Sequence, residues 1–221
     1  MSVWAVIVAA GRGERLGLDR PKAFANLNGR PLLAESLERL ESSEWVDSIV
    51  VASPPDWEEP VILLAEELGC GKVVSVVPGG ETRPESVRAG IAEVAEDAAV
   101  ALVHDAARPV LGEDIINRVM TALNEGWDGV VPALPVSDTV KRVRGEEVLE
   151  TIERSDLVVA QTPQAFVASL LRTALGADVA GATDCAALVE AAAGRVRVVE
   201  GDRRLMKVTE PADLELVANW L

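Results

Sequence analysis

Short runs of β-branched apolar residues alternate with longer amphipathic segments, and this alternation restricts the fold more than any other feature of the chain. The short runs are almost continuously apolar, which is typical of strands buried on both faces. The predicted strands cover residues 3–9, 48–52, 73–77, 100–104, 129–133 and 196–199. The predicted helices cover residues 31–41, 57–68, 83–96, 113–125, 164–175, 184–193 and 211–220. The pattern predicts one α/β domain over residues 1–221, with a mostly parallel twisted sheet and helices on both faces.

Residues 135–160 interrupt the alternation. Short alternating segments on either side of Gly145 predict a β-hairpin arm that projects from the α/β body. A hairpin on its own is marginally stable in water. We therefore expect the arm to pack against a second copy of the chain and form a homodimer, with an ordinary surface hairpin as the alternative.

The charge of the chain excludes one class of partner. Among its 221 residues, 36 are acidic and 21 are basic, for a net charge of −15. Nonspecific binding to nucleic acid depends on neutralising phosphates with Lys and Arg, and an anionic membrane surface attracts the same residues. We expect neither as a partner.

The apolar start and the cysteines predict a cytoplasmic protein. The apolar residues 3–10 lack a preceding basic segment and indicate a buried first strand, not a signal peptide. Cys70 and Cys185 are far apart in the sequence, as expected of small buried side chains in a reducing compartment.

The loop after the first strand carries the first sign of chemistry. Open α/β sheets bind ligands at the carboxyl ends of their strands. Gly11 and Gly13 let backbone N–H groups approach phosphate oxygens, and Arg15 and Lys22 add positive charge. The glycine spacing differs from the dinucleotide-binding fingerprint, and no acidic residue follows the second strand, which argues against NAD. The loop predicts a polyphosphate site, with its other arginines as solvated surface charges.

Two further loops follow predicted strands. Gly80, Glu81 and Ser86 belong to a glycine-containing loop whose backbone amides suit a base or a phosphate. Asp105 follows the fourth strand, where it would either orient the hydration shell of Mg²⁺ or form a structural pair with Arg108. The only histidine of the chain lies beside it, and we expect a hydrogen-bonding role for that side chain.

The ordered set of motifs resembles a known family. The motifs are Ala9-Ala10-Gly11-x-Gly13-x-Arg15, Pro21-Lys22, Gly79-Gly80-x-x-Arg83-x-x-Ser86, His104-Asp105-Ala106-Ala107-Arg108-Pro109, Asp138-Thr139, Thr162-Pro163-Gln164, Thr183-Asp184 and Lys207-Val208-Thr209. Over nearly the whole chain they resemble the 2-C-methyl-D-erythritol 4-phosphate cytidylyltransferases, which use CTP in the non-mevalonate isoprenoid pathway. The resemblance implies a Rossmann-like nucleotidyltransferase fold and a dimer formed through the β-arm.

The resemblance also assigns roles to residues. Those implied for CTP are Ala9, Ala10, Gly11, Gly13, Arg15, Lys22, Gly80, Glu81, Ser86, Asp105 and Ala106. Those implied for the methylerythritol phosphate are Asp105, Arg108, Thr139, Arg154, Thr162, Thr183 and Lys207, with Arg154 acting on the neighbouring subunit's site. Catalysis falls to Arg15, Lys22 and Lys207, with Mg²⁺ as cofactor. The chain departs from the family at Glu81, where Asp is frequent, and at Cys185, where an acidic residue is common.

The implied reaction agrees with the scarcity of histidine. A phosphate monoester is a dianionic nucleophile near neutral pH, so its attack on a nucleotide needs alignment and charge stabilisation more than a general base. Two alternatives remain open from the residues: a cytidylyltransferase for another polyol phosphate, such as ribitol 5-phosphate, and a nucleotide-binding module without activity.

Overall fold

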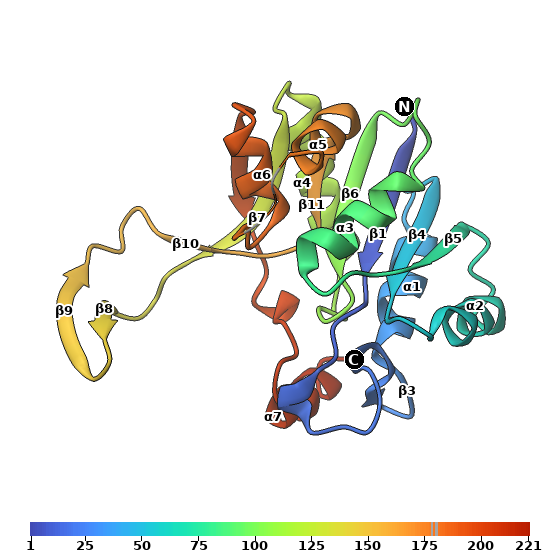
Figure 1. The fold of residues 1–221 in the computed structure, drawn as a ribbon, viewed down its shortest axis with the longest axis horizontal. Coiled ribbons are helices and arrows are strands. Elements are labelled where there is room, and N and C mark those ends of the chain that lie inside the picture. Colours follow the sequence, from blue (N-terminus) through green and yellow to red (C-terminus); the bar gives the residue numbers. More distant parts are fainter. Residues whose placement is uncertain (178, 180) are drawn as a thin grey trace.

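A computed structural model describes residues 1–177, 179 and 181–221 of the chain. Its main element is an eight-stranded sheet with the strand order β10-β7-β11-β6-β1-β4-β5 and with β12 paired to β7 (Figure 1). The strands are β1 (Val3–Val8), β4 (Ser48–Ser53), β5 (Val73–Pro78), β6 (Val100–Asp105), β7 (Gly129–Pro135), β10 (Val158–Ala160), β11 (Gln164–Val167) and β12 (Val196–Glu200). Pairing is parallel except at β10 and β11. The mostly parallel α/β sheet predicted from the sequence is confirmed.

Helices cover both faces of the sheet. On one face lie α1 (Leu32–Ser42), α2 (Glu58–Glu67) and α4 (Glu113–Asn124), and on the other lie α3 (Arg83–Ala92), α5 (Ala168–Leu175) and α6 (Cys185–Ala191). Alternate residues of β1 serve the two faces: Ala5 and Ile7 pack with the first group, and Val6 packs with the second. This alternation explains why the strand is apolar at nearly every position.

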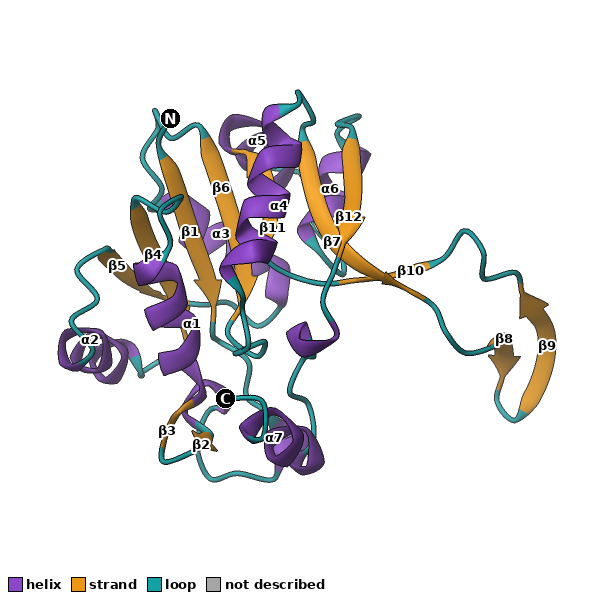
Figure 2. Cartoon of the chain, turned by 180° about the vertical axis from the view of Figure 1, so that it is seen from behind, coloured by secondary structure: helices purple, strands orange, loops and turns teal. Residues whose placement is uncertain are grey.

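A separate small lobe lies at the carboxyl end of the sheet (Figure 2). It contains two short strands, β2 (Asn26–Leu27) and β3 (Arg30–Pro31), and the last helix, α7 (Pro211–Ala218). A third cluster of buried apolar side chains holds it together. Because this lobe includes residues from both ends of the sequence, it connects the start and the end of the chain beside the carboxyl ends of the strands.

One predicted helix is wrong at its start. The segment predicted as a helix over residues 164–175 forms β11 first and becomes helical only at Ala168. The backbone of β11 pairs antiparallel with both β6 and β7, and Phe166 packs fully buried against Gly129. Pairing with two neighbouring strands outweighs the local helical pattern, since propensity is a weak determinant beside tertiary contacts.

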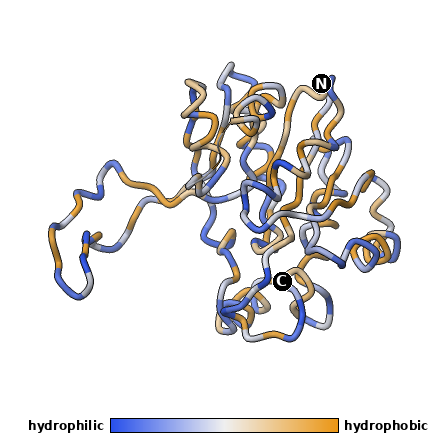
Figure 3. The backbone as a smooth tube through the Cα atoms, in the orientation of Figure 1, coloured by the Kyte–Doolittle hydropathy of each residue, from blue (hydrophilic) through white to orange (hydrophobic). Residues whose placement is uncertain are grey.

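The segment from 135 to 160 leaves the body of the molecule (Figures 1 and 2). Strands β8 (Val140–Arg144) and β9 (Glu147–Ile152) form a two-stranded antiparallel sheet of their own, and β10 returns along the end of β7. The arm, defined as residues 135–160, exposes several apolar side chains: Val143, Val148, Leu149, Val158 and Val159. Figure 3 shows these apolar stretches along the arm, alternating with hydrophilic ones.

No helix among the described residues combines the length and the apolar character needed to cross a membrane.

Candidate active site

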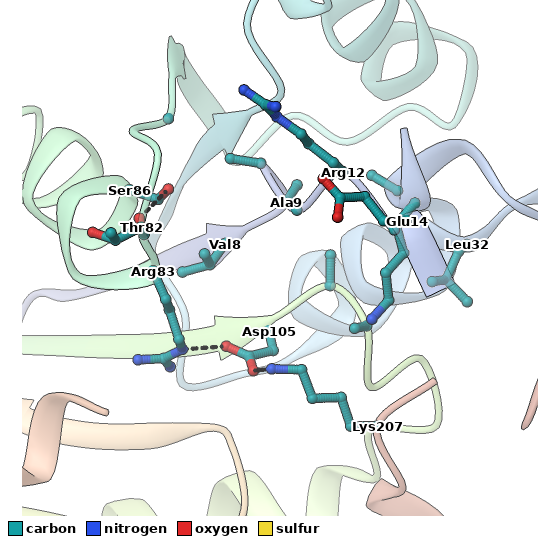
Figure 4. A pocket seen from close by; sticks show the side chains of 18 of the residues that line it. Val8, Ala9, Arg12, Glu14, Leu32, Thr82, Arg83, Ser86, Asp105 and Lys207 are labelled. Carbon is teal, nitrogen blue, oxygen red and sulfur yellow. Dashed lines mark hydrogen bonds and ion pairs between the residues drawn. The ribbon is translucent and has the colours of Figure 1, made fainter. Parts of the chain in front are cut away.

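A cavity of about 810 Å³ opens at the carboxyl ends of β1 and β6 (Figure 4). Its walls come from the first loop (residues 9–22), the second loop (residues 79–86), the end of β6 and the segment 207–209. Every residue assigned to CTP by the resemblance lines this cavity, and so does Lys207. The cavity therefore lies where the carboxyl-end rule for open α/β sheets expects a ligand site.

The first loop is shaped by glycine. Gly13 has a φ of +72°, a left-handed conformation that other residues adopt with strain. A Cβ atom at this position would lie 2.7 Å from the Cβ of Lys22, and the Lys22 amide donates to the carbonyl of Gly11 at 3.3 Å. Glycine thus allows the loop to fold back on itself, and both Arg15 and Lys22 line the cavity.

The second loop packs directly against the first. A Cβ atom on Gly79 would collide with the Cβ of Ala10, so only glycine permits this approach. The buried hydroxyl of Ser86 accepts from the Gly80 amide at 3.1 Å and donates to the Thr82 carbonyl at 3.0 Å. Thr82 and Glu85 then form a capping box that starts α3. Ser86 therefore fixes the shape of the loop in addition to lining the cavity.

Asp105 is the centre of an ion triad at the base of the cavity (Figure 4). Its Oδ1 atom accepts from Arg83 Nε at 2.8 Å, and its Oδ2 atom accepts from Lys207 Nζ at 2.8 Å. Burial alone would raise the pKa of Asp105, but the charges and hydrogen bonds of Arg83 and Lys207 outweigh it and hold that pKa far below its usual range. The carboxylate stays ionised.

This arrangement corrects one expectation and adds one residue. Arg108 does not form the structural pair with Asp105 that the sequence left open; it donates to the carbonyl oxygens of Leu205 at 2.5 Å and Ala160 at 3.4 Å. Arg83 takes that place and was missed as a site residue. Its position in the second-loop motif, three residues after Gly80, was the available signal.

Lys22 lies in an unusual electrostatic environment. Burial, followed by the positive charge of Lys207, lowers its pKa to about 8, and Arg15 acts in the same direction. Asp105 and Asp213 oppose the shift. Like charges from opposite ends of the sequence are therefore held close together in a partly buried cavity, an arrangement that an anionic ligand would stabilise.

His104 acts as a structural residue, as the sequence suggested. It is completely buried, and burial lowers its pKa to about 4. Its Nδ1 atom lies 3.2 Å from the Thr162 hydroxyl, and its Nε2 atom lies 3.1 Å from the Arg108 carbonyl. The Thr162 hydroxyl also accepts from the Asp105 amide at 3.0 Å, so this buried threonine holds the backbone of Asp105 in place.

The other residues assigned to the second substrate lie outside the cavity lining. Thr139 and Arg154 belong to the arm, where the Arg154 guanidinium donates to the Ser137 carbonyl. Thr183 lies just before Asp184, which caps α6 by accepting from the Ala187 amide at 3.0 Å. Within the described residues, a single chain therefore brings together the residues assigned to CTP but not all of those assigned to the methylerythritol phosphate.

Both cysteines are buried and protonated. Burial raises the pKa of Cys70 and of Cys185 to about 11, so neither thiol is a nucleophile near neutral pH. The Arg83 Nη1 group donates to the Cys185 sulfur at 3.6 Å, so this thiol contacts the guanidinium that pairs with Asp105.

Asp105 does not suit the role of a direct Mg²⁺ ligand. Each of its carboxylate oxygens is already bonded to a cationic side chain. Among the described residues, no group of three or more His, Cys, Asp or Glu side chains is arranged to hold a metal ion.

The triad leads to a prediction about stability. The side chain of Asp105 is 7% exposed and that of Arg83 is 18% exposed. Asp105→Ala leaves a largely buried guanidinium without its counter-ion, so we expect the free energy of unfolding to fall by about 3–5 kcal/mol. Urea denaturation followed by circular dichroism measures it. Asp19→Ala, which breaks the exposed pair with Arg20, should leave the urea midpoint unchanged, and an equal loss in both variants would contradict the assignment.

The chain has a cation-lined cavity at the carboxyl edge of its sheet and superimposes on solved α/β nucleotidyltransferases, so it has the fold of that class. The model of the 2-C-methyl-D-erythritol 4-phosphate cytidylyltransferase (IspD) family matches residues 3–221. The chain belongs to this family, and the resemblance inferred from its motifs is confirmed.

Known proteins agree with this assignment. The 2-C-methyl-D-erythritol 4-phosphate cytidylyltransferase of Nocardia farcinica is 46% identical over 221 residues, covering 100% of this chain and 94% of the relative. That of Rhodococcus jostii is 46% identical, covering 97% of this chain and 92% of the relative. The crystal structure of the enzyme from Thermus thermophilus superimposes with a TM-score of 0.78 at 32% identity, covering 97% of this chain and 96% of that one.

Proposed function

We propose that the protein transfers CMP from CTP to 2-C-methyl-D-erythritol 4-phosphate, giving 4-diphosphocytidyl-2-C-methyl-D-erythritol and pyrophosphate. The family identifies the substrates, and one structural observation carries the chemistry. Lys22 and Lys207 reach one cavity from opposite ends of the sequence, close enough for the charge of Lys207 to lower the pKa of Lys22. Two anions that must react with each other require cations of this kind on both sides.

The reaction joins two phosphates. An oxygen of the methylerythritol phosphate attacks the α-phosphorus of CTP, a new P–O bond forms, and the bond from the α-phosphorus to the β-phosphate oxygen breaks. Arg15 and Lys22, on the first loop, stabilise the charge that develops on the departing pyrophosphate. Lys207 binds the incoming phosphate while Asp105 holds its ammonium group in place, and Arg83 holds the other oxygen of the same carboxylate.

No side chain has to remove a proton. The attacking phosphate is largely dianionic at neutral pH, since its second pKa is about 6. His104 is buried, uncharged and bonded to Thr162 and Arg108. The rate therefore depends on alignment and on electrostatic stabilisation.

We propose Mg²⁺ as the cofactor, held by the phosphates of CTP. Mg²⁺ retains several water ligands and is commonly bound through substrate phosphates, and both oxygens of Asp105 are engaged by Arg83 and Lys207. Activity should vanish on chelation and return with added Mg²⁺. We further propose a cytoplasmic location, which is supported by the two separate, buried free cysteines.

Pyrophosphate release tests the proposed function. The assay uses CTP and Mg²⁺ with 2-C-methyl-D-erythritol 4-phosphate and, separately, with ribitol 5-phosphate. We expect rapid release with the first and little with the second. A preference for ribitol 5-phosphate would overturn the proposed substrate, and binding of CTP without turnover of either would overturn the proposed activity.

The pKa of Lys22 predicts the pH dependence. Below a pH of about 8 the ammonium group is charged and binds the CTP phosphates, and above that value it becomes neutral. We expect kcat/KM for CTP, which reports the free enzyme, to fall on the basic side with a midpoint near pH 8. In Lys22→Arg the guanidinium stays charged, so this basic limb should disappear. A wild-type profile that stays flat up to the ordinary pKa of a lysine would contradict the prediction.

We propose that the chain is a homodimer formed through the arm, whose exposed apolar side chains would be covered by a second copy. In this dimer, Arg154 of one subunit completes the cavity of the other. A complementation experiment tests it: Lys22→Ala has an intact arm, and Arg154→Ala has an intact cavity. Each variant alone should be nearly inactive, but the mixed dimer contains one complete site, so mixing should restore measurable activity. If mixing restores nothing although subunits exchange, the shared site is wrong.

A further inference from the structure

The carboxylate of Asp213 makes a set of contacts that the proposed mechanism does not use. Asp213 lies in the first turn of α7. One oxygen, Oδ2, accepts from the Thr209 amide at 2.7 Å, from the Thr209 hydroxyl at 2.7 Å and from the Glu210 amide at 2.9 Å. All three bonds converge on the turn that follows Lys207, and the bond from the Glu210 amide also belongs to the capping box that starts α7, so this oxygen atom ties the turn to the helix.

The same segment is held from its other side. The amide of Val208 donates to the carbonyl of Ala107 at 2.8 Å, and the side chain of Val208 is completely buried. Lys207 therefore projects into the cavity from a short backbone stretch fixed to the end of β6 at one point and to α7 at another.

The helix α7 also rests on the first loop. The third apolar cluster consists of Leu16, Ala25, Leu27, Leu32, Val110, Val208 and Val217, with Leu214 and Trp220 packed against it. Several members of this cluster are close in sequence to the cations of the site. The pairs are Leu16 with Arg15, Ala25 with Lys22, Val110 with Arg108 and Val208 with Lys207. In addition, the Asn28 side chain donates to the Ala218 carbonyl at 3.1 Å. Figure 2 shows α7 beside β2 in this lobe.

We propose that Asp213 is a positioning residue that, through α7, sets the location of Lys207 relative to Arg15 and Lys22 on the first loop. The inference rests on the proposed function, since these cations hold the two reacting phosphates. Misplacement of either phosphate by about 1 Å lowers the rate of an in-line transfer by up to roughly 10²-fold. Asp213 thereby acts on the alignment of the two substrates without touching either.

Two substitutions at this position separate hydrogen bonding from charge. Asp213→Asn retains one carbonyl oxygen, which is enough because all three bonds use Oδ2 alone. Asp213→Ala removes every bond. Steady-state kinetics with CTP and 2-C-methyl-D-erythritol 4-phosphate should give a kcat for Asp213→Asn within about threefold of the wild type, and a kcat for Asp213→Ala lower by about tenfold or more. Glu215→Ala, on an exposed position of the same helix, is the matched control and should match the wild type.

A substitution at Thr209 covers the case in which Asp213→Ala fails to fold. Thr209→Val keeps the shape of the side chain and removes one of the three bonds. With the same urea midpoint as the wild type, its kcat should fall by roughly threefold to tenfold.

The outcomes are distinct. An unchanged kcat in folded Asp213→Ala or in Thr209→Val would overturn the positioning role while leaving the proposed function intact. Equal damage in Asp213→Asn and Asp213→Ala would show that the charge of Asp213 acts instead of its bonds, and would also overturn it. Absence of turnover in the wild type would overturn the proposed function and this inference together.

Discussion

Lys207→Ala is expected to lower kcat/KM for 2-C-methyl-D-erythritol 4-phosphate by about 10²–10³, because the attacking phosphate loses its positive partner in the transition state. Its affinity for CTP, measured by calorimetry, should change little. The fold should survive, since the Lys207 side chain is 41% exposed and Asp105 keeps its bond to Arg83. The matched control is Arg204→Ala, which removes a nearby exposed cation paired with Asp202.

The pH profile of Lys207→Ala gives an independent test of the same geometry. The charge of Lys207 lowers the pKa of Lys22, so its removal should raise that pKa and move the basic limb of kcat/KM for CTP to higher pH. Near-wild-type turnover would reject the assignment of Lys207 to the attacking phosphate. An unmoved basic limb would show that the two ammonium groups do not interact in solution.

Lys22→Ala is expected to lower kcat/KM for CTP by a similar factor. Without this ammonium group, the phosphates of CTP lose a largely buried cation, so KM for CTP should rise and kcat should fall, with kcat/KM down by about 10²–10³. Calorimetry should show weakened CTP binding, in contrast to Lys207→Ala. The basic limb near pH 8 should be absent from the residual activity, because the group that titrates there has been removed.

Arg20→Ala supplies the control for Lys22→Ala. Arg20 lies on the same loop, but its side chain is 53% exposed and is bonded to Asp19. The variant should retain wild-type kinetics. If Arg20→Ala were as impaired as Lys22→Ala, the loss would reflect the overall charge of the loop and not a specific position in the cavity.

The layout of the site could be predicted from the sequence because strand ends are visible in it. Two predicted strands end just before Ala10 and just before Asp105, and loops at the carboxyl ends of neighbouring parallel strands must meet at one edge of the sheet. The glycines of the first two loops mark close backbone approaches for the same reason. Lys207 was different: nothing in its local sequence indicates a ligand, and only its place in an ordered set of motifs pointed to the site.

The partners of long side chains could not be predicted. Asp105 and Arg108 are close in sequence, and a pair between them was a reasonable hypothesis. The chain turns after β6, however, with the Arg108 amide bonded to the Asp105 carbonyl, and the guanidinium extends toward Leu205 and Ala160. Arg83 reaches Asp105 because α3 begins beside the end of β6. Such pairings depend on how elements pack, which hydrophobic periodicity does not encode.

The prediction of a helix from residue 164 was wrong for a related reason. Residues 164–167 continue the apolar spacing of the following helix, so the local pattern favours one long helix. The gap between β6 and β7 accepts a strand at that point, and a strand in the middle of a sheet satisfies its backbone on both sides.

The lobe that joins distant parts of the sequence affects how the protein acquires activity during synthesis. Ribosomes release the first loop early, whereas Lys207, Asp213 and Val217 are made much later. A nascent chain can pair β1 with β4 and β6 well before α7 exists, but Leu16 and Leu27 then lack the part of their apolar cover that comes from Val208 and α7. The site is therefore completed only when α7 has left the ribosome and docks, and until then the growing polypeptide exposes an apolar surface of the kind that chaperones recognise.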